Sequence, residues 1–141
     1  MIATDSNVLA RLLIDVSPAG DALRDAVRRA IGSGDQLCLP APCIGEFWRV
    51  VTWDKNPERV SPAVAYAFLS DWISRNALLL PGPRYWSTLA ALIAAQTPST
   101  LGIFDYQIAA VRIEHAVDAI WTFDSRFPRS PRLSLVDPLA L

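Results

Sequence analysis

Four acidic residues of this chain occupy positions where the surrounding residues are mostly apolar. They are Asp5, Glu46, Asp105 and Asp124. A buried carboxylate is costly in free energy unless it is hydrogen-bonded, paired with a cation or bound to a metal ion. Apart from Arg49, no Lys or Arg lies within three residues of Asp5, Glu46 or Asp105. Four carboxylates in apolar settings with few local counter-ions therefore indicate a shared divalent cation.

The chemistry of such a cluster follows from its charge. Carboxylates that converge repel one another, and each raises the pKa of its neighbours. A divalent cation relieves this repulsion, and ligands that are all oxygen favour Mg²⁺ or Mn²⁺ over zinc. A bound ion of this kind generates hydroxide from water and stabilises the charge that develops on a phosphoryl group. The four residues therefore predict metal-dependent hydrolysis of phosphodiester bonds.

Short apolar runs separated by helical patterns predict the elements that position these residues. We expect strands at 2–4, 36–39, 78–80, 119–122 and 133–136, and helices at 8–13, 20–31, 40–53, 63–75, 86–95 and 101–116. The last helix is apolar on almost every face and is expected to be central and buried. Alternating strands and helices predict an α/β fold, a three-layer sandwich in which helices flank a short, mostly parallel sheet. A length of 141 residues fits a single domain over 1–141.

The predicted order of elements brings the four acids to one edge of the sheet. Ligands bind beyond the carboxyl ends of the strands in sheets of this type. Asp5 directly follows the first strand, and Asp124 lies just beyond the fourth. Glu46 is expected one turn into the helix after the second strand, and Asp105 in the first turn of the buried helix. All four can therefore converge on one site.

Each acid also has an ordinary structural interpretation. Asp5 could cap the first helix, and Asp105 could complement a helix dipole. Glu46 could pair with Arg49 one turn on, and Asp124 could be a turn residue. Four such roles together, at strand ends of an apolar chain, are a weaker account than one shared site.

Composition limits the class of protein. Hydrophobic residues make up 52% of the chain and charged residues 19%, with a mean hydropathy of +0.26. This surplus favours an apolar surface that a partner covers. The net charge is −1, so the chain lacks the excess of basic residues that is typical of nucleic-acid-binding domains.

The cellular location can also be predicted. No apolar run reaches the roughly 18 residues needed to span a membrane, and the N-terminus lacks the basic start of a signal peptide. Cys38 and Cys43 are too few for a secreted disulfide scaffold. We therefore expect a cytoplasmic protein that does not contact membranes.

The motifs around the four acids resemble the PIN-domain family, and specifically the VapC-like toxin ribonucleases of bacterial toxin–antitoxin pairs. The matching segments are 1–9, Leu39-Pro40 with Glu46-Phe47, 80–83, Asp105 with 108–110, Thr122-Phe123-Asp124 with Phe127, and the ending 137–139. The likeness covers essentially the whole chain.

This resemblance implies a Mg²⁺- or Mn²⁺-dependent endoribonuclease that cleaves RNA. Asp5, Glu46, Asp105 and Asp124 would take the family's acidic, metal-holding positions. Asn7 and Thr122 would be polar supports that orient a carboxylate or a metal-bound water.

The resemblance also implies partners. A cognate antitoxin would inhibit the protein, and the toxin would form a homodimer, within a larger toxin–antitoxin assembly in some cases. The surplus of apolar residues agrees with such partners.

Three residues depart from the family pattern, among them Ala116, where Gly often follows Glu-His. Arg126 stands where the family often has a further Asp, and it could bind RNA phosphate or pair with Asp124. Tyr106 stands where the family usually has Ala, and it could stack on a base or pack against a neighbouring helix. The alternative is a non-catalytic PIN-like module that binds RNA or a protein partner. A phosphate-binding P-loop is excluded because its Gly-rich motif is absent.

Overall fold

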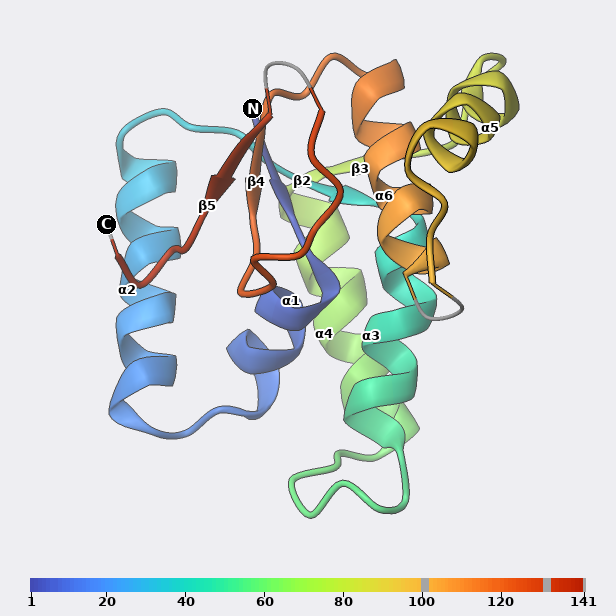
Figure 1. Cartoon of the computed structure of the whole chain (residues 1–141). Helices are drawn as coiled ribbons and strands as arrows, with labels where there is room; N and C mark the ends of the chain where they lie inside the picture. The colour runs from blue at the N-terminus through green and yellow to red at the C-terminus, as the bar shows by residue number, and fades with distance from the viewer. Residues whose placement is uncertain (100–101, 131–132, 141) are drawn as a thin grey trace.

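A parallel five-stranded sheet forms the centre of the protein. The computed structural model describes residues 1–99, 102–130 and 133–140. The strands are β1 (Ile2–Thr4), β2 (Leu37–Pro40), β3 (Ala77–Leu79), β4 (Ala119–Trp121) and β5 (Ser134–Val136). They are arranged in the order β3-β2-β1-β4-β5, and every neighbouring pair is parallel. The first strand of the chain is therefore the central one (Figure 1).

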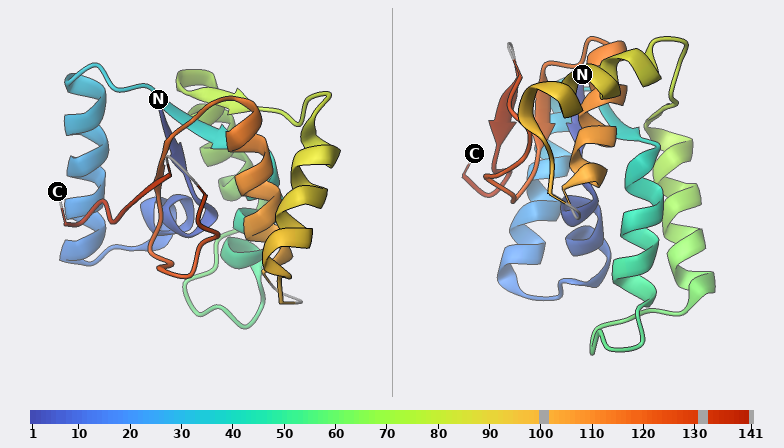
Figure 2. Two further views of the ribbon diagram at one scale, coloured as in Figure 1. Left: turned by 45° about the horizontal axis from the view of Figure 1, so that its top comes forward. Right: turned by 45° about the vertical axis from the view of Figure 1, so that its right-hand side comes forward.

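Six helices join these strands. They are α1 (Ser6–Ile14), α2 (Pro18–Gly32), α3 (Pro42–Thr52), α4 (Pro62–Arg75), α5 (Tyr85–Gln96) and α6 (Ile103–Glu114). Figures 1 and 2 show helices on both sides of the sheet, with α2 and α5 at opposite ends of the molecule. The predicted three-layer α/β fold is confirmed.

The register of the sheet places two strand ends side by side. Thr4, the last residue of β1, pairs with Trp121, the last residue of β4. One residue further on, the Asp5 backbone N–H donates to the Trp121 carbonyl at 3.0 Å. The Thr4 hydroxyl donates to the Cys38 carbonyl in β2 at 3.0 Å. The segments that follow β1 and β4 are therefore held together at the carboxyl edge of the sheet.

The predicted elements are all present, and their ends differ for local reasons. The helix expected from 40 begins at Pro42, because Pro40 belongs to β2 and a proline fits the first turn of a helix. The helix expected over 101–116 spans Ile103–Glu114, and its expected first residue, 101, lies outside the described residues. The helix ends there because Ala116 has a positive φ of 53°, which α-helical backbone does not adopt.

Helix α6 is central, as its sequence predicts. Ile108, Ala109, Ala110 and Val111 are all buried in it. Arg112 is also buried, and its guanidinium donates to the Val117 carbonyl at 2.8 Å. This helix is therefore a rigid platform for the acidic residue in its first turn. In the described part of the chain, no helix has the length and apolar character needed to cross a membrane.

Candidate active site

Asp5 is the most buried of the four acids, with 2% of its surface exposed. As the N-cap of α1, it accepts a 2.6 Å hydrogen bond from the Ser6 backbone N–H. Its other oxygen accepts from the Asn7 amide at 2.8 Å and from the Thr122 hydroxyl at 2.6 Å. Burial raises the pKa of Asp5, and the hydrogen bond from Thr122 opposes that rise. Asp5 is therefore both a helix cap and a fixed member of the site.

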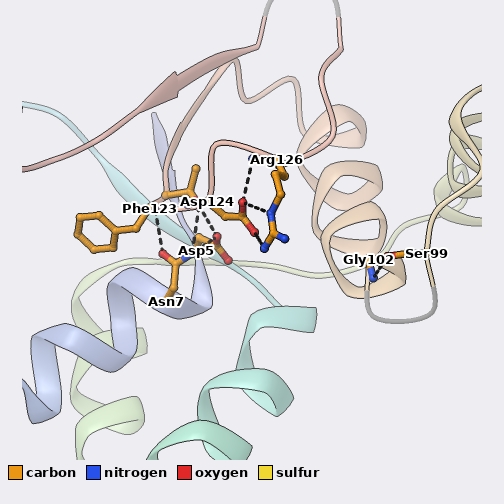
Figure 3. A network of polar contacts seen from close by, with 8 residues as sticks. Asp5, Asn7, Ser99, Gly102, Phe123, Asp124 and Arg126 are labelled. Carbon is orange, nitrogen blue, oxygen red and sulfur yellow. Dashed lines mark hydrogen bonds and ion pairs between the residues drawn. The ribbon is translucent and has the colours of Figure 1, made fainter.

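Asn7 and Thr122 connect the start of α1 to the end of β4. The Asn7 amide group donates to the Thr122 hydroxyl at 3.1 Å, and its oxygen accepts from the Phe123 backbone N–H at 3.2 Å. The Thr122 hydroxyl oxygen accepts from the Asp124 backbone N–H at 3.0 Å. Figure 3 shows this network around Asp5. Asn7 and Thr122 therefore both donate hydrogen bonds to Asp5, where β1 and β4 end.

Glu46 approaches Asp5 through a shared serine. The Ser6 hydroxyl lies 2.5 Å from Glu46 Oε2 and 3.1 Å from Asp5 Oδ1. A hydroxyl has one hydrogen, so we assign the donation to the shorter contact, with Glu46. Among the described residues no ion pair joins Glu46 to Arg49. The alternative in which Glu46 pairs along its own helix is therefore not realised.

Asp105 lies in the first turn of α6 and is half-buried. Burial, followed by the charges of Asp5, Glu46 and Asp124, raises its pKa from 3.8 to about 7. Arg126 acts in the opposite sense. The other three carboxylates are thus close enough to Asp105 to make its ionisation unfavourable.

Asp124 is held by Arg126. The Arg126 side chain donates from Nε to Oδ1 and from Nη2 to Oδ2 of Asp124, both at 3.1 Å, and its backbone N–H donates to Oδ1 at 2.8 Å (Figure 3). These bonds lower the pKa of Asp124. Of the two roles considered for Arg126, pairing with Asp124 is the one that the structure shows.

The four carboxylates line one cleft of about 700 Å³, together with Ser6 and Asn7. We call it the acidic cleft. Its lining includes Asp5, Ser6, Asn7, Arg11, Glu46, Arg49, Phe104, Asp105, Tyr106, Asp124 and Arg126. Thr122 does not line the cleft, but its hydroxyl donates a hydrogen bond to Asp5. The structure therefore brings the four predicted acids and Asn7 to one cavity.

The donor set of the acidic cleft suits a hard divalent cation, since it consists of carboxylate oxygens. After burial, the charges of the other three acids raise the pKa of Asp105, and such an ion would relieve this repulsion. Among the described residues, however, no three Asp, Glu, His or Cys side chains stand in an arrangement that could hold an ion. Glu46 contacts Ser6 and Asp124 contacts Arg126 instead. The residues fit a metal ion by charge and chemistry.

Sequence reasoning missed two contributors to the site. Ser6, which bridges two carboxylates, follows Asp5 directly, and that adjacency was the available signal. Arg11 lies over the ring of Phe123, 4.3 Å from its centroid, a contact that joins distant parts of the chain. Only the fold reveals such a contact.

Tyr106 and Cys43 are both buried, and their contacts indicate structural rather than chemical roles. Tyr106 is 8% exposed and packs with Leu89 of α5 and with Ala110. Of the two roles considered for Tyr106, packing against a neighbouring helix is therefore the one that the structure shows. Cys43 is fully buried, and burial followed by the charges of Asp5 and Glu46 raises the pKa of its thiol. A thiol held protonated is a poor nucleophile.

Comparison with known proteins identifies a family match. The family model of the PIN domain matches residues 2–133. No curated protein matches the sequence.

Three solved structures share the fold. The toxin VapC20 of Mycobacterium tuberculosis, described as cleaving the sarcin–ricin loop, has a TM-score of 0.67 at 13% identity, over 90% of this chain and 92% of its own. VapBC2 of Rickettsia felis, bound to promoter DNA, has a TM-score of 0.69 at 15% identity, over 96% and 98%. FitAcB of Neisseria gonorrhoeae has a TM-score of 0.66 at 16% identity, over 100% of both chains.

Proposed function

The chain belongs to the PIN-domain family, and from that premise we propose that it is a Mg²⁺- or Mn²⁺-dependent endoribonuclease. The observation that carries this proposal is the convergence of Asp5, Glu46, Asp105 and Asp124 in one cleft. We also propose that residues 1–141 form one domain, because β1 and β5, from the two ends of the chain, belong to one sheet.

The four acids would hold the ion. When bound, the ion would supply an activated water and would neutralise charge on the phosphate. Asn7 and Thr122 fix the orientation of Asp5 through their hydrogen bonds. The Ser6 hydroxyl lies between Asp5 and Glu46 and contacts both carboxylates. This chain would thus supply carboxylates that line one cleft rather than a nucleophile of its own.

A cleavage assay tests the nuclease. Purified protein is incubated with total cellular RNA in Mg²⁺, in Mn²⁺ and in EDTA, beside the Asp5→Asn variant. We expect cleavage with either metal and none in EDTA or with the variant. Robust cleavage by the variant in EDTA would show that the carboxylates and the metal are not responsible.

We propose that the protein is the toxin of a toxin–antitoxin pair and acts in the cytoplasm. VapC20 is described as a toxin, and VapBC2 and FitAcB are complexes. Their low identity makes them a guide to fold, so this assignment rests on the family. Co-expression tests it: a protein encoded next to this gene should bind the chain and suppress its cleavage of RNA. A folded chain whose activity no neighbouring product suppresses contradicts the assignment.

We propose that the chain forms a homodimer through α5. Nearly all residues of this helix are apolar or small, yet among its residues only Leu89 is buried. It packs against α6 and leaves Trp86 69% exposed. An exposed apolar helix at the end of the molecule (Figure 1) is the kind of surface that a second copy covers.

A second candidate is a PIN-like module that binds RNA or a partner without catalysis. Its support is the ion pair between Arg126 and Asp124, which occupies both oxygens of that carboxylate. This candidate predicts RNA binding without cleavage at any metal concentration. The cleavage assay therefore separates the two.

A further inference from the structure

In the part of the chain that the structure describes, three arginines line the acidic cleft, and they differ in which groups their side chains contact. They are Arg11 from α1, Arg49 from α3 and Arg126 from the segment after β4. Arg126 is paired with Asp124 and also lowers the pKa of Asp105. Arg11 and Arg49 are both exposed where they line the cleft, and we call their positions the rim.

Arg11 is held in place by an aromatic ring. Its guanidinium lies over Phe123, 4.3 Å from the ring centroid, and the backbone of Phe123 is fixed by its hydrogen bond to Asn7. A stacked guanidinium keeps its N–H groups at the edge, where they can bind a phosphate in a bidentate manner. Arg11 is exposed and takes part in no ion pair among the described residues. Its position is thus held by stacking, and its charge, which adds to local hydrogen bonds in lowering the pKa of Asp15, remains available for a phosphate.

Arg49 is available in the same sense. It lies one turn after Glu46 on α3 and is exposed, again with no ion pair in the described ranges. Arg24, Arg28 and Arg75 behave differently, since each pairs with an Asp three or four residues earlier on its own helix. Two arginines without such partners therefore face one cleft from two different helices.

We propose that Arg11 and Arg49 bind backbone phosphates of a single RNA strand that crosses the acidic cleft, one from α1 and one from α3. This inference rests on the proposed ribonuclease function. A cleft floored by four carboxylates repels a polyanion, so cations at the rim must hold the backbone while the linkage to be cut lies over the acids. Phosphate contacts of this kind fix register without reading sequence.

The exposed ring of Phe104 supports binding of single-stranded rather than duplex RNA. Phe104 lines the cleft beside Asp105 and is 41% exposed. Aromatic rings at such positions stack on unpaired bases, which a duplex does not offer.

Salt-dependent binding tests the proposal. Anisotropy of labelled single-stranded oligouridine and oligoadenosine is measured over a salt series in the Asp105→Asn background, in which we expect cleavage to be slower by roughly a hundredfold or more. Each phosphate contact contributes about 0.7 to the slope of log K against log salt for a single strand. We expect Arg11→Ala and Arg49→Ala each to reduce the slope by about that amount and the double variant by about twice as much. Both oligonucleotides should lose affinity equally.

Arg29→Ala is the matched control, because Arg29 is exposed on α2 and does not line the cleft. Thermal unfolding of each variant verifies that the fold is intact. If Arg11→Ala and Arg49→Ala give the slope of Arg29→Ala while wild-type protein cleaves RNA in Mn²⁺, the phosphate contacts are wrong and the nuclease stands. If wild-type protein neither binds nor cleaves RNA, both proposals are wrong.

Discussion

The Thr122 hydroxyl donates a 2.6 Å hydrogen bond to Oδ2 of Asp5, across 117 residues of sequence. The two residues follow β4 and β1, which pair in the sheet from Ile2 to Thr4. Both side chains are buried. This bond therefore fixes the buried carboxylate of the cleft to the neighbouring strand end.

Replacing Thr122 with Val should destabilise the protein. The change keeps the shape of the side chain but removes the donor to Asp5 and the acceptor for the Asp124 N–H. We expect a loss of about 1–3 kcal/mol in the free energy of unfolding, the usual cost of leaving a buried polar group unsatisfied. Urea denaturation measures it. Thr52→Val is the control, because the Thr52 hydroxyl only contacts the Trp48 carbonyl of its own helix; equal losses in both variants would contradict the role of Thr122.

Replacing Arg126 with Ala should strengthen metal binding. Arg126 holds both oxygens of Asp124 and competes with a cation for that carboxylate. Because the arginine side chain is 88% exposed, its ion pair is weak, and we expect Mn²⁺ affinity to rise by only about two- to fivefold. Titration calorimetry measures the change, with Arg129→Ala as the control. Unchanged or weaker Mn²⁺ binding in Arg126→Ala would show that the pair does not compete with the ion.

The sequence predicted the strands and helices well because their apolar periodicity is strong and prolines and glycines separate them. It also placed Asp5 and Asp124 at the ends of the first and fourth strands, since both follow short buried runs. It could not predict that Glu46 contacts Ser6 rather than Arg49, because both contacts are compatible with the local pattern.

The stacking of Arg11 on Phe123 was likewise beyond prediction. It depends on β1 and β4 being neighbours in the sheet, which is a property of the three-dimensional order of strands. The pairing of Arg126 with Asp124 was one of two alternatives, and local geometry decided between them.

The stability of metal-free protein should depend on pH through Asp105. Its pKa is raised from 3.8 to about 7 by burial and by the nearby carboxylates. Between about pH 4 and pH 7 the folded state keeps a proton that the unfolded state has lost, so this group lowers the free energy of unfolding as pH rises. The Asp105→Asn variant has no carboxyl at this position, so this pH-dependent fall in the free energy of unfolding should disappear. In EDTA, the stability of the variant relative to wild type should therefore increase from pH 4 to pH 7, and a constant difference would contradict the raised pKa.

A charge on the exposed face of α5 should disrupt the proposed dimer. Ala91 is exposed on this apolar helix, and Ala91→Glu would place a carboxylate in the interface, where an unpaired charge is costly. Light scattering after size-exclusion chromatography should show a dimer for wild type and a monomer for the variant. Ala22→Glu, on the exposed face of α2, should remain dimeric. A dimeric Ala91→Glu variant would show that the interface lies elsewhere. A wild-type monomer would show that the proposed dimer does not form.

The most direct test of the account is the rate of cleavage of a defined single-stranded RNA by wild type and Asp105→Asn, in EDTA and after Mn²⁺ is restored. Asp105 is the best variant because it is half-buried and does not cap a helix, unlike Asp5. The account predicts that wild type is inactive in EDTA and active again with Mn²⁺, and that the variant is slower by roughly a hundredfold or more at equal metal. Cleavage that persists in EDTA, or a variant as fast as wild type, would contradict a metal-dependent nuclease built on these carboxylates.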